Sequence, residues 1–330
     1  MRTQVCLAVQ RLHRVLWLLA GFFSCAAAPV VHAQGYPTKP IKLVVGFAVG
    51  GVTDLMGRAL AQKLSSQLGQ PVYVEVRTGA DSLLASQMMM RAEPDGYTLY
   101  LATTAHAVNQ TLFRKAGFDA VNDFTSISLF CDIPNVIAIN PTLPVKTLGE
   151  FISYAKARKG ELNYSTSASG TFLAAEMMNR AAGIALQRIP YKGAAPAMVA
   201  LMSNEVQMTV TGIGSVVPYL NTNKIKILAV ASPKRSTLAP DIPTASEAGL
   251  PNHATSTWYA VLGPPKMSRE LQERLNTEVR KALADPDFAA TLLKLGAVPQ
   301  SSSPAELEVF MRSEVEKWKK IIQETNAQED

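Results

Sequence analysis

Short runs of β-forming residues alternate with helical patterns along most of this chain, and this alternation constrains the fold more than any other feature. Residues 41–46 are predicted to form a strand, and apolar residues recur every four positions in the helical pattern of residues 54–68. A strand at 72–76, a helix at 83–91 and a strand at 98–102 continue the series. This order predicts an α/β fold with largely parallel sheets.

A second series of the same kind follows, and the last third of the chain is predicted to be helical. The predicted strands are residues 135–140, 162–165, 187–191, 206–210 and 226–231. The predicted helices are residues 147–158, 171–182, 195–202, 269–283, 286–294 and 304–324. Two such series suit two lobes better than one core, given a chain of this length.

The first 33 residues have the pattern of an export signal. Three arginines and no acidic residue accompany an apolar stretch at 15–23, and Val31-His32-Ala33 fits the rule for signal peptidase. We therefore predict a signal peptide at residues 1–33, cleaved near Ala33. The alternatives are an uncleaved membrane anchor, for which the apolar stretch falls short of the roughly 20 residues needed, and a lipidated Cys25, which lacks the usual leucine before it.

Charge and cysteine content exclude several classes of protein. Cleavage removes three of the 32 basic residues and none of the 26 acidic ones, which leaves the mature chain at +3. That balance, without long Lys/Arg runs, does not indicate a nucleic-acid binder. Cys131 is the one cysteine left after cleavage and is predicted to be buried. No Cys/His cluster has metal-ligand spacing, so neither a metal nor a cofactor is expected.

Small polar residues follow five of the predicted strands, where open α/β sheets bind their ligands. After the first strand, Gly50 and Gly51 precede a helix that Thr53 or Asp54 can cap. The free N–H groups and positive end of such a helix favour an anion. A plain loop with a capped helix explains any one of these segments, but five together predict a ligand site. The other four are residues 103–106, 165–171, 191–195 and 211–215.

Enzyme signatures are missing from the sequence. It contains no G-x-S-x-G elbow, Walker A loop, G-x-G-x-x-G or H-E-x-x-H segment. His106 and His253 are the two histidines of the mature chain, and His106 is expected to be a polar surface residue. Hydroxyls and amides without a general base predict binding rather than turnover.

Six segments, in this order and spacing, resemble the Bug-type (TctC-like) receptors of tripartite tricarboxylate transporters. The resemblance covers almost the whole mature chain. The segments are Tyr36-Pro37-Thr38-Lys39-Pro40-Ile41, Phe47 through Gly50-Gly51 to Thr53-Asp54, Pro94-Asp95-Gly96-Tyr97-Thr98-Leu99, Pro190-Tyr191-Lys192-Gly193, Asp241-Ile242-Pro243-Thr244-Ala245-Ser246-Glu247-Ala248-Gly249, and Trp258.

The resemblance implies a two-lobed type II periplasmic-binding-protein fold, a Venus flytrap with a central cleft and a hinge. Lobe I would comprise residues 34–134 and 255–330, and lobe II residues 135–254. A periplasmic, monomeric receptor for a small carboxylate is implied, with membrane transporter subunits as its partners. Alternatives are a sensory receptor of the same fold that signals to a membrane kinase, and an exported α/β enzyme.

The resemblance also implies the site residues. Backbone amides around the glycine loop would hold the proximal carboxylate, partly through waters, at Ala48, Gly50, Gly51 and Thr53. Other loops would add hydroxyl or amide donors at Thr103, Thr104, Ser167, Ser169 and Thr171. Thr211 is added as a site residue; it stands where many members have an aspartate, which argues against amino-acid ligands.

Three further expectations concern charge and departures from the family pattern. Asp54 should cap its helix, because it would repel a carboxylate, and Tyr191-Lys192 should brace its loop. No Arg or Lys lies in the three best loops, so amides and hydroxyls should hold the anion. Val49 replaces a common proline, and Asp81-Ser82 replaces a common Gly-Gly pair.

Overall fold

The computed structural model describes residues 35–327. The described residues 35–38 belong to one unit, in which the Tyr36–Pro37 peptide bond is cis, and Lys39 begins a second unit to which everything below refers. The predicted export segment, residues 1–33, lies outside the described residues. Among the described helices, none combines the length and apolar character needed to cross a membrane.

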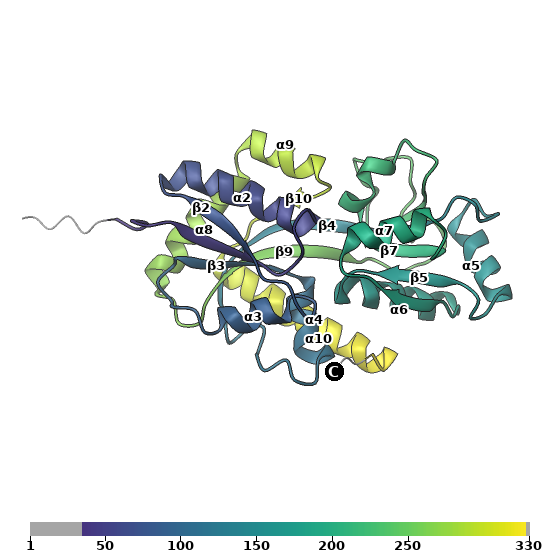
Figure 1. Cartoon of the computed structure of the whole chain (residues 1–330), viewed down its shortest axis with the longest axis horizontal. Coiled ribbons are helices and arrows are strands. Elements are labelled where there is room, and N and C mark those ends of the chain that lie inside the picture. The colour runs from purple at the N-terminus through teal and green to yellow at the C-terminus, as the bar shows by residue number, and fades with distance from the viewer. Residues whose placement is uncertain (1–34, 328–330) are drawn as a thin grey trace, which may run out of the picture. The chain divides into compact units, whose positions relative to one another are not determined.

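The strands form a single curled sheet that divides into two groups (Figure 1). The sheet order is β2-β1-β3-β9-β4-β7-β5-β6, and β8 and β10 each pair with β4. The bounds are β1 (Ile41–Val45), β2 (Val72–Val76), β3 (Thr98–Thr103), β4 (Thr125–Ile139), β5 (Asn163–Thr166), β6 (Gln187–Pro190), β7 (Met208–Gly212), β8 (Lys226–Ala231), β9 (Ser256–Gly263) and β10 (Val298–Pro299).

Strand β4 belongs to both groups. From Thr125 to Pro134 it pairs with β9, and from Asn135 to Ile139 it pairs with β7 and β8. We call β1, β2, β3, β9, β10 and the first part of β4 the first strand group, and β5 to β8 with the second part of β4 the second strand group. The pairing therefore changes partners between Pro134 and Asn135.

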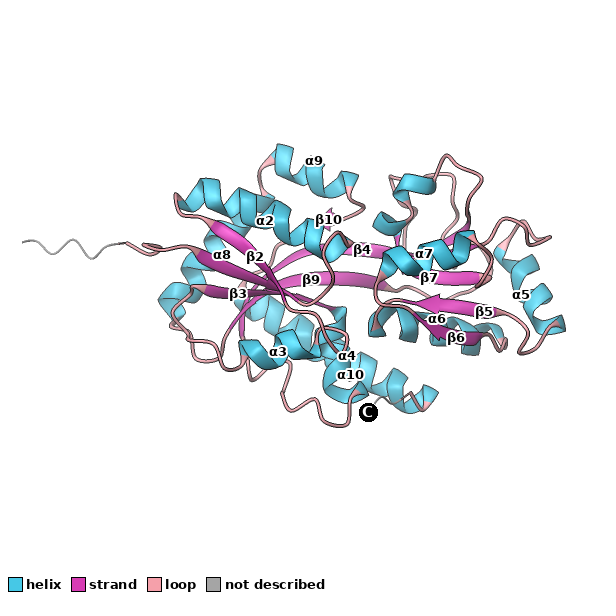
Figure 2. Cartoon of the chain, viewed as in Figure 1, coloured by secondary structure: helices cyan, strands magenta, loops and turns pink. Residues whose placement is uncertain are grey.

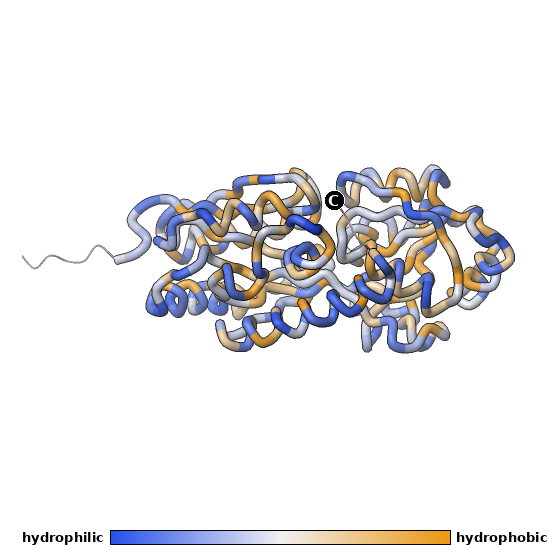
Figure 3. The backbone as a smooth tube through the Cα atoms, turned by 90° about the horizontal axis from the view of Figure 1, so that it is seen from below, coloured by the Kyte–Doolittle hydropathy of each residue, from blue (hydrophilic) through white to orange (hydrophobic). Residues whose placement is uncertain are grey.

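Helices lie on both faces of the strands (Figure 2). The bounds are α2 (Val52–Leu68), α3 (Leu83–Met89), α4 (Thr104–Leu112), α5 (Leu148–Ala157), α6 (Ser169–Ala182), α7 (Ala194–Met202), α8 (Arg269–Leu283), α9 (Pro286–Lys294) and α10 (Pro304–Thr325), with the 3-10 turns η1 (Ile213–Ser215) and η2 (Val217–Tyr219). Several outer helices alternate between hydrophilic and hydrophobic residues in Figure 3, as amphipathic helices do.

Local sequence explains where the longest helices start and stop. Ser303 and Glu306 form a capping box at the start of α10, with Pro304 at the first helical position, where its missing N–H is not needed. Gly69, in the left-handed conformation, ends α2. Side chains on the inner faces of these elements build two apolar cores, one containing Tyr100, Trp258 and other residues of the first group, and one in the second group.

The structure differs from the predicted elements at four points. The sheet is mixed rather than largely parallel, because β9 and β4 run antiparallel to their neighbours. Strand β9 was missed, because no element was predicted between residues 231 and 269, and β4 begins ten residues before the strand predicted at 135–140. Residues 103–106 were taken as a loop, but Thr104 begins α4. The missed strands β9 and β4 pair with segments that lie far away in sequence.

Candidate functional site

Two adjoining cavities lie where the strand groups meet. The first, of about 390 Å³, is lined by nine of the ten predicted site residues: Ala48, Gly50, Gly51, Thr53, Thr103, Thr104, Ser167, Thr171 and Thr211. We call it the hydroxyl cavity. The second, of about 450 Å³, is lined by the tenth, Ser169, and by Asp81, Arg188 and Lys192, so we call it the charged cavity. The two share Phe47, Ala48, Ser167, Ala168, Lys192 and Gly193.

The glycine loop at one wall of the hydroxyl cavity is held by its own helix. The Asp54 carboxylate accepts a hydrogen bond from the Gly50 N–H at 2.9 Å, and the Gly51 N–H donates to the Ala48 carbonyl at 3.2 Å. Helix α2 starts at Val52, and its N-cap, Gly51, makes no side-chain capping bond. Neither Thr53 nor Asp54 is the N-cap, so that expectation was wrong.

This bonding changes which amides face a ligand. The Gly50 and Gly51 N–H groups are already used inside the loop. The first N–H groups of a helix have no intrahelical acceptor, and in α2 these belong to Val52, Thr53 and Asp54. Gly50 is still required, because its φ of 80° is unfavourable for other residues. The amides of this wall that remain available to a ligand are therefore those of the first turn of α2.

Asp54 is a buried carboxylate with a partly exposed partner. Its side chain is 2% exposed, and its Oδ2 accepts from Arg58 Nε at 3.0 Å. Burial pushes the pKa of Asp54 upward, but the hydrogen bonds from Arg58 and from the Gly50 N–H outweigh it, so that the pKa is lowered. The carboxylate stays ionised and serves the loop.

The hydroxyls of the hydroxyl cavity differ in what they can donate. Thr104 Oγ1 donates to the Ser256 carbonyl at 3.5 Å and accepts from the Trp258 N–H at 3.1 Å. Thr171 Oγ1 donates to the Ala168 carbonyl at 2.9 Å. A hydroxyl has one proton, so neither of these can donate to a ligand without losing its present bond.

The remaining hydroxyls keep a proton for a ligand. Thr103 Oγ1 only accepts, from the Ala105 N–H at 3.3 Å, as the N-cap of α4. Thr53 Oγ1 and Tyr259 Oη lie 3.2 Å apart, and this pair needs only one of its two protons for their mutual bond. Among the described residues, Ser167 and Thr211 make no side-chain hydrogen bond. Four positions on separate loops and strands can therefore donate into one cavity.

The charged cavity has a different lining. Arg188, on β6, donates from Nε to Thr166 Oγ1 at 3.2 Å, and its guanidinium lies 3.8 Å from the centre of the Phe172 ring. Lys192 is exposed and lines both cavities. The expectation that only amides and hydroxyls surround an anion was thus incomplete, since two cations lie in the walls. Tyr191 Oη donates to Glu205 at 2.7 Å, and burial and this carboxylate raise the pKa of Tyr191 to about 12.

His106 is buried behind the site and lines neither cavity, which corrects the prediction of a surface position. It is 0% exposed, its Nε2 donates to the Ala120 carbonyl at 3.0 Å, and its Nδ1 accepts from Ser86 Oγ at 2.8 Å. Burial lowers the pKa of His106 to about 4, although Asp119 opposes this. Ser86 and Ser82 both bond Tyr100 Oη, so a neutral network runs from His106 to the loop before α3.

The lining of the two cavities carries no catalytic constellation. The described residues that line them include neither histidine nor cysteine. Cys131 is buried, as predicted, and burial raises its pKa well above the usual value. In the described part of the chain, no three His, Cys, Asp or Glu side chains gather as a metal site would require. The arrangement can orient and hold an anion.

Comparison with known proteins identifies the family. Residues 56–327 match the family described as "Tripartite tricarboxylate transporter family receptor". The chain belongs to this family. Protein BugT of Bordetella pertussis is 33% identical over 320 residues, which cover 95% of this chain and 98% of that protein.

Solved structures of this receptor family share the two-lobed fold of the chain. An R. palustris protein solved with adipate has a TM-score of 0.85 and 32% identity, covering 89% of this chain and 99% of its own. MatC from Rhodopseudomonas palustris with bound malate has a TM-score of 0.81 and 30% identity, covering 87% and 100%. The relatives are periplasmic binding proteins, and their class is that of solute receptors rather than enzymes.

Sequence reasoning missed several residues of the walls. Tyr259, whose pKa is raised by burial, lies on the unpredicted strand β9, and the run of aromatic and apolar residues from Trp258 to Leu262 was the available signal. Arg188 and Asp81 come from loops and strands that meet only in the folded chain, so no local pattern indicated them.

Proposed function

We propose that this receptor captures a small carboxylate in the hydroxyl cavity and delivers it to the membrane subunits of a transporter. The observation that carries the proposal is the convergence of four free donors, at Thr103, Ser167, Thr211 and the Thr53–Tyr259 pair, on one cavity. Hydrogen bonds from neutral donors to an ionised group are stronger than those between neutral groups. A carboxylate is the simplest anion that such a set can satisfy.

The first turn of α2 would hold the proximal carboxylate. Its N–H groups lack intrahelical acceptors and lie at the positive end of the helix dipole. All ten predicted residues remain in the proposed site, but in different roles. Gly50 and Gly51 shape the loop, Thr104 and Thr171 fix neighbouring backbone, and Ser169 lines the charged cavity.

The proposed lobes and location follow from the same reasoning. We infer that residues 34–134 and 255–330 form lobe I, that residues 135–254 form lobe II, and that lobe closure encloses the ligand. The change of partners in β4 between Pro134 and Asn135 supports this division. Export by the 1–33 segment would bring the mature protein to the periplasm, where relatives act. Relatives solved with adipate and malate support the carboxylate class.

A thermal-shift screen of mono-, di- and tricarboxylates against ligand-free protein tests the proposal. A ligand at 100 times its Kd stabilises the native state by about 2.7 kcal/mol, which is easily measured as a rise in Tm. No shift with any carboxylate contradicts the assignment. Unchanged ligand recovered from the complex, and delivery to reconstituted membrane subunits, separate a transport receptor from an enzyme.

One substitution tests the site itself. Thr211→Val removes a hydroxyl and keeps the side-chain shape, so affinity for the best ligand should fall about 10- to 100-fold. Thr209→Val is the matched control, because Thr209 lies on the same strand, bonds the Ser165 carbonyl, and does not line the cavity. Equal affinities of the two variants, measured by calorimetry, would exclude Thr211 from the site.

A further inference from the structure

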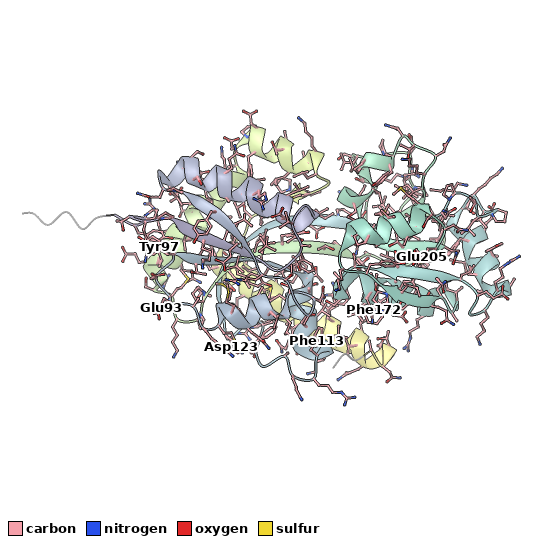
Figure 4. The ribbon with its side chains drawn as sticks, in the orientation of Figure 1. Glu93, Tyr97, Phe113, Asp123, Phe172 and Glu205 are labelled. Carbon is pink, nitrogen blue, oxygen red and sulfur yellow. The ribbon has the colours of Figure 1, made fainter. Side chains whose placement is uncertain are left out.

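Helix α6 contacts both strand groups. Phe172 and Leu173, in its first half, belong to the apolar core of the first group, and Ala174 and Met178 belong to the core of the second. Figure 4 labels Phe172 on this helix. At its other end, Arg180 Nη1 donates to the Glu324 carbonyl of α10. The helix that carries Ser169 and Thr171 therefore forms the contact surface between the lobes.

The first turn of α6 is capped from the opposite lobe. Ala168 is its N-cap and has no side chain that can accept a hydrogen bond. Instead, the Ser169 N–H donates to Asp81 Oδ2 at 2.7 Å, across 88 residues of sequence. A carboxylate at a helix N-terminus satisfies a free N–H group and interacts favourably with the helix dipole. Asp81 thus supplies from lobe I the cap that lobe II lacks.

A second bond pair joins the same residues. Asn109 Nδ2, from α4, donates to the Asp81 carbonyl at 2.6 Å, and Ser169 Oγ donates to Asn109 Oδ1 at 3.0 Å. Asn109 is 0% exposed and Ser169 is 4% exposed, so these bonds are shielded from water. Asp81, Asn109 and Ser169 form a closed set of three hydrogen bonds across the boundary between the lobes.

The loop that presents Asp81 has an unusual backbone. Ala80, Asp81 and Ser82 have φ values of 43°, 50° and 72°, in the left-handed region that non-glycine residues rarely adopt. Such conformations persist where the surroundings fix them, and they gather at functional positions. Ser82 Oγ bonds Tyr100 Oη at 2.6 Å inside lobe I, which fixes one side of the loop. The bond to α6 fixes the other side.

We propose that Asp81 is a positioning residue that draws lobe II onto lobe I by accepting the Ser169 N–H. This proposal rests on the proposed function in one respect, because lobe closure is taken to enclose the ligand. Asp81 also lines the charged cavity beside Arg188 and Lys192, so a direct electrostatic effect on the ligand is the competing explanation. The variants below separate the hydrogen bond from the charge.

Two substitutions remove the bond from opposite sides. Asp81→Gly removes the acceptor and tolerates φ of 50°. Ser169→Pro removes the donor N–H at the first helical position, where proline is favoured, and the preceding Ala168 is already extended at φ −161° and ψ 159°.

Asp81→Asn keeps an acceptor oxygen and loses the charge. Ser169→Ala keeps the N–H and loses only the bond to Asn109.

The test measures the distance between the lobes by double electron–electron resonance in the purified, ligand-free protein. The spin labels are attached to cysteines introduced by Lys156→Cys and Lys281→Cys, since both lysines are exposed. We expect Asp81→Gly and Ser169→Pro each to shift the distances toward an open population, and the double variant to add little. Asp81→Asn should stay close to the wild-type distribution, and Ser169→Ala, which loses one neutral hydrogen bond to Asn109, should open less than Ser169→Pro. This readout needs no ligand, so it stands or falls separately from the carboxylate assignment.

Ligand kinetics give the second readout, with adipate and malate as probes. For a probe that binds, Asp81→Gly should raise the dissociation rate about 10- to 100-fold, as expected for a lost charge-assisted hydrogen bond, and leave the association rate nearly unchanged. Wild-type distances in Asp81→Gly overturn the proposal. An Asp81→Asn variant that opens as far as Asp81→Gly also overturns it, because the charge and not the bond would then be responsible.

Discussion

The two loops that follow β1 and β2 are supported in opposite ways. The loop at Gly50 and Gly51 presents a neutral wall to the hydroxyl cavity, yet it is held by the buried, ionised Asp54 and its bond to Arg58. The loop at Asp81 presents a charge to the charged cavity, yet it is held by the neutral network that runs from Ser82 to His106. The Gly50 loop is therefore stabilised by a charged residue, whereas the Asp81 loop exposes a charged residue to its cavity.

This inversion has a physical basis. A fixed charge beside an anion site must be neutralised, and in Asp54 two hydrogen bonds do so while the first turn of α2 stays available. A charge that has to reach across to another lobe needs a rigid support, and a buried neutral network supplies it without desolvating a second ion. The two loops should therefore fail under different conditions of pH and salt.

Acid should act on the Asp81 loop first, and this is the largest effect we expect. Burial holds the pKa of His106 at about 4, below its ordinary value of 6.5, so the native state resists a proton that the unfolded state binds. Stability is therefore lost as the pH falls from 6.5 toward 4, by about 3 kcal/mol for a shift of this size. Urea unfolding at pH 7, 6 and 5 measures the loss.

His106→Gln provides the comparison for that slope. The variant removes the titrating group, so its unfolding free energy should depend less on pH between 6.5 and 4 than that of the wild type, even if it is less stable at pH 7. His253 is also buried, and burial lowers its pKa to about 4, so part of the slope should remain. Identical slopes in the variant and the wild type would show that His106 does not titrate in this range.

The Asp54 loop should respond to acid only at lower pH, and more weakly. The folded pKa of Asp54 lies below 3.8, so its contribution is present above 3.8 and is lost as the pH falls through the folded value. Asp54→Asn replaces charge-assisted bonds by neutral ones and should cost about 1 kcal/mol at pH 7. Chemical denaturation at pH 7 and pH 3 should show a smaller acid-induced loss in the variant; an unchanged difference contradicts the role given to Asp54.

The sequence predicted elements such as β1 and α2, because each of them carries its own local signal. All but one residue of β1 is fully buried, and α2 repeats apolar residues on one face. Missed elements have polar residues that are satisfied at long range. Ser128, in β4, bonds the Ser302 carbonyl 174 residues away, and His106, in α4, bonds Ser86. No local pattern shows that such polar side chains are buried.

The same limit applies to the candidate site. Nine of the ten site residues, which the family resemblance implied and which lie in segments after strands, line one cavity, since carboxyl ends of neighbouring parallel strands meet at one edge. Their roles required the folded chain. Only the observed bonds show that the Gly50 N–H donates to Asp54, or that the Ser169 N–H donates to Asp81, 88 residues away in sequence. Residue types in the sequence indicated which residues line the cavity, and the hydrogen bonds in the structure show what each of them does.

Lys192 offers the smallest effect and the sharpest separation of the two cavities. It is exposed and lines both, so its charge should attract an anion to the cleft rather than hold it. Lys192→Met should weaken affinity by about two- to fivefold, mainly through a slower association rate that depends less on ionic strength. Stopped-flow binding at low and high salt measures this, with Lys224→Met, exposed and outside both cavities, as the matched control. A hundredfold loss at every salt concentration would mean that Lys192 binds the ligand directly, and that the hydroxyl cavity alone does not hold the anion.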